Sequence, residues 1–190
     1  MSKPILKRSE VAEKDTWNLG DIFESDELWR SEYENLKAAP ESILKYRGRL
    51  GESAGLLLGY FRLSDEISVR LGKLYGYASC KGDEDTGNSF YQDMRSKAMS
   101  VYVAIGSANA FAAPEIMSIP DETLDKFYAE CPDLETYRRS IYQMRRRKEH
   151  ILSPECETLL ASAGEMADSP NSIGSVFRNA DLKFPDVVDA

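Results

Sequence analysis

The only histidine of the chain, His150, is the first candidate for chemistry, because an imidazole can bind a metal ion or transfer a proton. A zinc-binding helix of the H-E-x-x-H type places two imidazoles one turn apart, with a carboxylate beside them. Here Ile151 follows His150, and Pro154 stands where the second histidine would be. We therefore predict no metal site, and place His150 near the C-terminal end of a helix, where positive charge is favourable.

Positive charge gathers in one short part of the sequence. The basic residues there are Arg138, Arg139, Arg145, Arg146, Arg147 and Lys148. Such a cluster could bind a nucleic-acid backbone or an acidic peptide, but no glycine-rich or aromatic nucleic-acid module accompanies it. We favour a solvated helix face on which the long basic side chains pair with neighbouring carboxylates.

The acidic stretch that begins at Asp83 superficially resembles a calcium-binding loop. An EF-hand loop needs a glycine at its sixth position and a bidentate glutamate at its twelfth. Counted from Asp83, these positions hold Asn88 and Met94. We therefore predict a solvated loop between two helices.

The sequence contains no motif for nucleophilic or cofactor-dependent catalysis, such as G-x-S-x-G, a P-loop or a dinucleotide fingerprint. Its three cysteines, Cys80, Cys131 and Cys156, are widely spaced and form no C-x-x-C pair. This pattern is typical of buried or partly buried thiols in a reducing cytosol. The residues by themselves thus predict no catalytic residue and no metal ligand.

The length, composition and charge of the chain limit its domain count, its partners and its localisation. A chain of 190 residues with 42% hydrophobic residues suits one domain, or one domain with an added hairpin, and can bury a core without disulfides. A net charge of -8 argues against nonspecific binding to nucleic acid or to an anionic membrane. The N-terminus lacks the apolar region of a signal peptide, and no apolar run approaches the roughly 20 residues that span a bilayer. We expect a cytoplasmic protein without nucleic-acid or membrane partners.

Helical periodicity runs through most of the chain and predicts a mainly α fold built from antiparallel helical hairpins. We expect an N-terminal arm over residues 1–24, pinned to the body by large apolar residues between Trp17 and Phe23. A long-helix hairpin region follows over residues 25–113. Its helices are predicted over residues 25–36, 40–47, 53–63, 65–80 and 90–112.

Two glycines, Gly55 and Gly59, lie about one turn apart in the predicted helix over residues 53–63. Either they let another helix approach closely, or they only weaken the helix that contains them. The apolar residues around them point in most directions, so we expect this segment to be buried on several sides.

A second helical region is predicted over residues 114–190. Its helices begin near Pro120, Pro132 and Pro154, as is usual for proline in a first helical turn. Residues 182–188 alternate between apolar and polar side chains, which is typical of a strand. No other convincing strand is found in the sequence, so this strand would be unpaired. We infer that the chain is a fragment, cut before the second strand of a hairpin, with a further domain absent.

Three stretches carry a resemblance to a known family. They are residues 15–23 (DTWNLGDIF), the hairpin residues 74–78 (LYGYA) with 83–92 (DEDTGNSFYQ), and residues 147–161 (RKEHILSPECETLLA) with 179–185 (NADLKFP). Together they resemble the oligoendopeptidase F family of zinc metallopeptidases, which are relatives of thimet oligopeptidase. Their order and spacing extend the resemblance over nearly the whole chain.

The resemblance implies a helical N-terminal lobe that precedes a catalytic domain in the same chain. In that family a later H-E-x-x-H motif binds zinc, which polarises the scissile carbonyl and activates a water, while the glutamate acts as general base. Oligopeptide substrates enter a channel between the lobes. The zinc ligands and the catalytic glutamate have no counterpart here, so no catalytic, metal-binding or substrate-binding residue can be assigned.

We therefore expect the N-terminal helical lobe of a zinc-dependent oligoendopeptidase that hydrolyses short peptides. It would help to wall the peptide channel, hold no zinc itself and be inactive without its partner, the C-terminal catalytic domain. Surface exposed by truncation could lead to self-association. The alternative is a free-standing helical protein-interaction module, which would bind a partner through the basic cluster or the Gly55/Gly59 surface.

Overall fold

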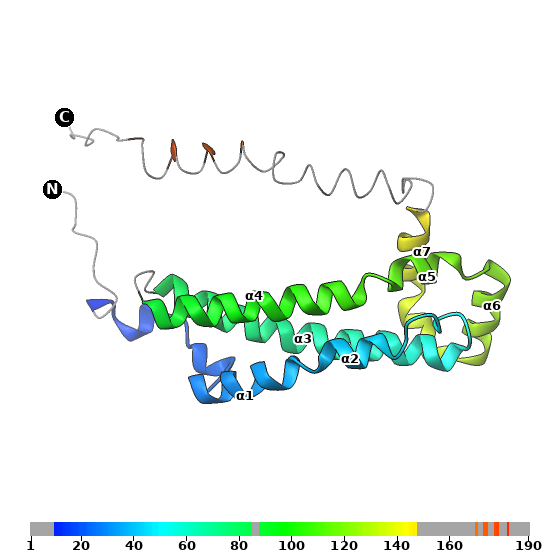
Figure 1. Cartoon of the computed structure of the whole chain (residues 1–190), viewed down its shortest axis with the longest axis horizontal. Coiled ribbons are helices and arrows are strands. Elements are labelled where there is room, and N and C mark those ends of the chain that lie inside the picture. Colours follow the sequence, from blue (N-terminus) through cyan, green and yellow to red (C-terminus); the bar gives the residue numbers. More distant parts are fainter. Residues whose placement is uncertain are drawn as a thin grey trace. The chain divides into compact units, whose positions relative to one another are not determined.

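The computed structural model describes residues 10–84 and 88–147, together with residues 170, 173, 174, 177, 178 and 182. The described residues are mainly helical and contain no strand, which confirms the predicted fold class (Figure 1). Of the predicted strand over residues 182–188, only Leu182 is described, and it lies in neither a helix nor a strand. The chain divides into two compact units, residues 1–145 and 146–190.

The first helix, α1 (Asp26–Leu36), begins as its sequence predicts. The Ser25 side chain caps it by accepting a hydrogen bond from the backbone N–H of Leu28, at 3.3 Å. Its inner face carries Trp29, whose indole Nε1 donates to the carbonyl oxygen of Leu74 at 2.8 Å. The bond satisfies a buried polar atom and ties α1 to the middle of the longest helix. A short helix, α2 (Ala39–Leu44), follows.

The longest helix, α3 (Ala54–Glu84), has 31 residues and replaces two predicted helices. The predicted boundary at Ser64 and Asp65 is wrong. These residues are accommodated inside the helix, where the Asp65 carboxylate accepts a hydrogen bond from the Tyr137 hydroxyl at 2.6 Å. A polar side chain with a tertiary partner does not need to terminate a helix.

Helix α4 (Ser89–Asn109) lies against α3 in an antiparallel hairpin, as predicted (Figure 1). Gln92 near the start of α4 donates to the carbonyl of Gly82 at 3.2 Å, and Asn109 at its end accepts from the Tyr60 hydroxyl at 2.8 Å. The predicted extension of this helix to residue 112 is wrong. In a continuous helix the ring of Pro114 would meet the carbonyl four residues earlier, so the chain turns and begins a new helix.

That new helix is α5 (Ala112–Ser118), and the following segment forms a second cluster of short elements. These are α6 (Asp121–Glu130), the 3-10 helix η4 (Pro132–Tyr137) and α7 (Arg138–Arg146). We expected one helix to begin at Pro132, but the first six residues are a tighter 3-10 helix. Tyr137 stacks on Phe61 of α3 with ring centroids 4.5 Å apart.

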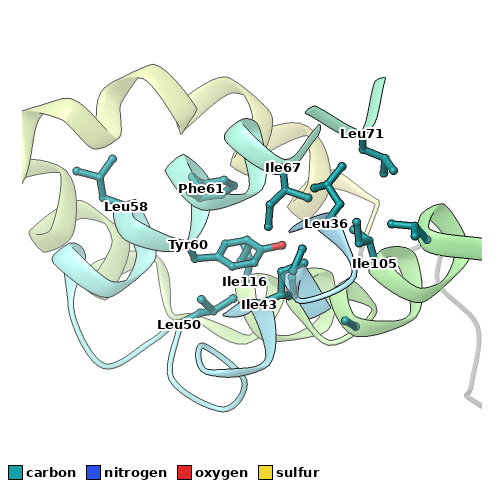
Figure 2. Close-up of a cluster of buried hydrophobic side chains, with 14 of the residues drawn as sticks. Leu36, Ile43, Leu50, Leu58, Tyr60, Phe61, Ile67, Leu71, Ile105 and Ile116 are labelled. Atoms are coloured by element: carbon teal, nitrogen blue, oxygen red, sulfur yellow. The ribbon is translucent and has the colours of Figure 1, made fainter. Parts of the chain in front are cut away.

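Apolar side chains from α1 to α7, from the 3-10 helices η3 (Leu19–Asp21) and η4, and from the α2–α3 connection form the core. Figure 2 shows Leu36, Ile43 and Ile116 lying together with Tyr60. The largest fully buried side chains are Leu36, Ile43, Leu50, Leu57, Leu74, Ile116, Leu134 and Ile141. Each buried side chain of this size stabilises the fold by about 1.5–3 kcal/mol relative to exposure.

The N-terminal arm is attached by fewer residues than expected. Leu19 is buried and Phe23 packs edge-on against Tyr77, with centroids 5.5 Å apart, but Trp17 is 88% exposed. A short 3-10 turn begins after Asn18, whose side chain accepts from the backbone N–H of Gly20. The prediction that Trp17 anchors the arm is therefore wrong.

The two glycines near the start of α3 differ in their surroundings. A Cβ atom at Gly55 would meet no other atom within 4 Å, so no helix packs closely there. A Cβ at Gly59 would lie 3.1 Å from the Tyr46 hydroxyl oxygen. Gly59 makes room for a side chain from the turn after α2, and within the described ranges neither glycine has another helix packed closely on it.

Candidate functional site

An open groove of about 530 Å³ lies between α6, η4 and α7. Its apolar part is formed by Leu124 and Ile141, which are buried, and by the rings of Tyr128 and Tyr142. Charged side chains line the rest: Asp121, Asp125, Glu135, Arg138, Arg139 and Arg145. Three of the six residues of the predicted basic cluster thus meet in one groove with three carboxylates.

The Arg138 guanidinium is held on two sides. It lies over the Tyr128 ring, 3.9 Å from the centroid, and its Nε donates to both carboxylate oxygens of Glu135 at 2.7 and 2.9 Å. Hydrogen bonding to Glu135 raises the pKa of Arg138, and burial raises the pKa of the Tyr128 hydroxyl. The positive charge of Arg138 is therefore largely matched within the groove.

Arg145, at the other end of the groove, stabilises the fold by binding backbone carbonyls and a carboxylate. Its guanidinium donates to the carbonyls of Ile116, at 3.3 Å, and Ile119, and to the carboxylate of Asp121 at 2.6 Å. Its side chain is only 19% exposed. Carbonyls at the end of a helix lack partners within that helix, so Arg145 acts as a C-terminal cap for α5.

The groove combines buried apolar side chains with charges that are partly paired within it. Its lining contains no histidine, cysteine or serine that could act as a nucleophile or base near neutral pH. The prediction that basic side chains pair with neighbouring carboxylates is confirmed for Arg138 and Arg145. Lys148 lies outside the described residues.

The remaining sequence candidates do not form a metal site in the part of the chain that the structure describes. No group of three or more His, Cys, Asp or Glu side chains is placed to hold a metal ion there. His150 and residues 85–87 of the predicted acidic loop lie outside the described residues, while Asp83 pairs with Arg95 at 3.2 Å. Cys131 is partly buried, but Cys80 is exposed, contrary to the prediction for the thiols.

No helix in the described ranges is both long and apolar enough to cross a membrane.

The chain is similar to bacterial peptidases over nearly its whole length. A family described as Oligopeptidase F matches residues 115–184, which include the groove. Oligopeptidase PepF of Bacillus subtilis (strain 168) is 42% identical over 182 residues, which is 96% of this chain and 27% of the relative. The plasmid-encoded oligoendopeptidase F of Lactococcus lactis subsp. cremoris is 38% identical over 94% of this chain and 30% of its own length.

A solved structure agrees with these matches. The crystal structure of oligoendopeptidase-F from Enterococcus faecium aligns with a TM-score of 0.66 and 33% identity, covering 85% of this chain and 31% of that chain. This chain therefore spans less than a third of the length of each of these relatives. The family resemblance predicted from the sequence is confirmed: the chain corresponds to the N-terminal part of oligoendopeptidase F proteins.

Proposed function

We propose that this chain is the N-terminal helical lobe of a zinc-dependent oligoendopeptidase that hydrolyses short peptides in the cytoplasm. The match to oligopeptidase PepF across 96% of the chain is the observation that carries the proposal. The relatives continue well beyond the matched part, so the lobe would be joined in one polypeptide to a catalytic domain. The predicted organisation of the lobe into residues 1–24, 25–113 and 114–190 stays a prediction.

The zinc ion would be held by that catalytic domain. The donors in the described part of this chain do not fit it, because structural and catalytic zinc sites need at least three protein ligands and no such group occurs there. Bound zinc would act as a Lewis acid on the scissile carbonyl. The role of the present residues would be to shape the space that admits a peptide.

The α3–α4 hairpin is suited to forming one wall of a channel. Its longer helix has 31 residues, which corresponds to about 46 Å of helix axis. Its two helices are joined by buried apolar contacts, so the hairpin can present a continuous and rigid surface. A rigid wall would favour short unfolded peptides over folded proteins, which are too wide to enter a closed channel.

Peptide cleavage tests the proposal. The full-length parent and the 190-residue chain would each be incubated with an internally quenched peptide, with and without a zinc chelator. We expect chelator-sensitive cleavage by the parent only, and stoichiometric zinc after dialysis in the parent only. Cleavage or stoichiometric zinc in the 190-residue chain would contradict the assignment of catalysis to the missing domain.

The parent reading frame separates this proposal from a free-standing interaction module. An H-E-x-x-H sequence on a predicted helix downstream would support the peptidase lobe. A natural stop codon after Ala190, together with recovery of one specific protein partner in a pull-down, would favour the interaction module instead.

A further inference from the structure

Helix α4 has two apolar faces, and the residues that the structure describes cover only one of them. The covered face packs on the core through Met94, Ala98, Val101, Ile105 and Ala108. On the opposite face Met99, Tyr102 and Val103 are 43%, 55% and 57% exposed. Tyr102 and Val103 follow Met99 by three and four positions, so both lie next to Met99 on the helix surface.

The sequence around this outer face is free of charge. Residues 98–114 include no Asp, Glu, Lys or Arg, although 29% of the chain is charged. A run of this length in a chain of ordinary composition would contain about four or five charged residues. A helix with apolar residues on all sides is normally buried on all sides. The outer face of α4 therefore has the composition of a buried surface.

The neighbouring part of α3 places a further aromatic ring beside this face. The Tyr75 ring lies beside Tyr102, with centroids 6.3 Å apart. On either side of Tyr75, a Cβ atom placed at Gly72 or Gly76 would meet no other atom within 4 Å. Small residues beside exposed aromatic rings leave room for another element to pack closely on the hairpin.

We propose that the face formed by Met99, Tyr102 and Val103, termed the outer α4 face, is covered by the part of the parent chain that follows residue 190. The inference rests on the proposed function and names the contact surface for the catalytic domain. In each of the relatives compared above, more than two thirds of the chain lies beyond the matched part. A segment of that size within the same polypeptide is present at high effective concentration.

A covalently joined domain fits this face better than a second copy does. A face without charge offers no electrostatic selection of a partner from solution, whereas a domain in the same chain needs none. Once covered within the parent, the face is not available to a second copy. Self-association through it would then belong to the isolated 190-residue chain alone.

Methionine oxidation measures whether the face is covered. Hydrogen peroxide converts an accessible methionine to its sulfoxide, and Met94 on the same helix is an internal control because it is only 3% exposed. In the dilute 190-residue chain, we expect Met99 to be oxidised about tenfold faster than Met94. In the full-length parent, we expect the rate for Met99 to fall to about that of Met94.

Two outcomes would overturn the inference while leaving the proposed function intact. One is a chelator-sensitive, active parent in which Met99 is oxidised as fast as in the 190-residue chain. The other is protection of Met99 that appears in the parent only as its concentration rises, which would assign the face to a second copy. A parent without peptidase activity would instead contradict the proposed function.

A charged substitution provides an independent measurement. Val103→Glu places a carboxylate on the outer α4 face, and Leu28→Glu places one on α1, where Leu28 is also exposed. We expect Val103→Glu to lower the melting temperature of the parent by a few degrees and to leave that of the 190-residue chain within about one degree. Leu28→Glu should change neither. Equal effects of Val103→Glu in both proteins would overturn the inference.

Discussion

The α3–α4 hairpin and the groove between α6, η4 and α7 differ in how far their side chains find partners within the described residues. In the hairpin, apolar residues pack on the core, while Met99, Tyr102 and Val103 remain exposed on the other side of α4. In the groove, Arg138 and Arg145 are matched by carboxylates and carbonyls of nearby residues. Two of the conspicuous charges are therefore balanced within the groove, whereas α4 carries an apolar face that no described residue covers.

In a helical lobe of this kind, an uncovered apolar face is a better indication of an interface than a cluster of paired charges. Charged clusters attract attention in a sequence, but paired charges at a surface contribute little that a partner could use. Apolar side chains that are exposed to water are unfavourable, and the free energy falls when another element packs on them. The hairpin is thus the better candidate for contact with the rest of the parent.

The largest effect is expected in the hairpin core. Leu74→Ala removes a fully buried side chain of α3 and should destabilise the 190-residue chain by about 2–5 kcal/mol through lost packing and a cavity. Val69→Ala on the exposed side of the same helix should change stability by less than about 0.5 kcal/mol. Urea unfolding measures both. Similar losses would mean that the two sides of α3 are not distinguished by packing.

The next largest effect on stability is expected to separate Arg145 from Arg138 in the groove. Arg145→Met removes the side-chain donor to the carbonyls of Ile116 and Ile119, of which Ile116 keeps the backbone N–H of Ile119, and should cost about 1–3 kcal/mol. Arg138→Met removes an exposed ion pair with Glu135 and should cost less than about 1 kcal/mol. Urea unfolding of the two variants would contradict the capping role of Arg145 if Arg138→Met were the more damaging change.

An ion pair between α3 of the hairpin and α1 makes the stability of the fold dependent on pH. Arg70 of α3 donates to both carboxylate oxygens of Glu32 on α1, at 2.6 and 3.2 Å, and this contact lowers the pKa of Glu32. A lowered folded-state pKa stabilises the fold above the unfolded-state value of about 4.3, and the contribution is lost as the pH falls through the folded-state pKa.

We therefore expect Glu32→Gln to be less stable than the unsubstituted chain at pH 7, with the difference disappearing in acid. Urea unfolding at pH 7 and at about pH 3 would measure the two differences. Glu66→Gln is the matched control, because Glu66 also pairs with Arg70 but is well exposed. A larger effect of Glu66→Gln would show that the interhelical contact is not the important one.

The smallest changes in stability are expected when glycines of α3 are replaced by alanine. Gly72→Ala adds a Cβ into open space in the middle of the helix and should stabilise the chain by about 0.5–1 kcal/mol. Gly59→Ala would bring a Cβ to 3.1 Å from the Tyr46 hydroxyl, so it should gain less or lose stability. Thermal unfolding compares the two. An equal gain at both positions would show that the Tyr46 ring moves aside freely.

Several features were predictable from local sequence. The helix starts near Ser25 and Pro120 were recognisable, because the signals for a helix start act within one turn of the chain. The continuity of α3 through Ser64 and Asp65 was not predictable, since it depends on Tyr137, which is 72 residues away from Asp65. The exposure of Trp17 was missed for a similar reason: its type suggested an anchor, but its position on the arm leaves it in water.

By itself, the sequence determined the mainly helical class and the similarity to oligoendopeptidase F proteins, because helical periodicity and family resemblance are both written in residue order. The tertiary structure decided which helix faces are covered, which arginine caps α5 and how far α3 extends. Those outcomes depend on contacts between residues far apart in the chain. No local pattern shows, for example, that Met94 of α4 is buried while Met99, five residues later, is exposed.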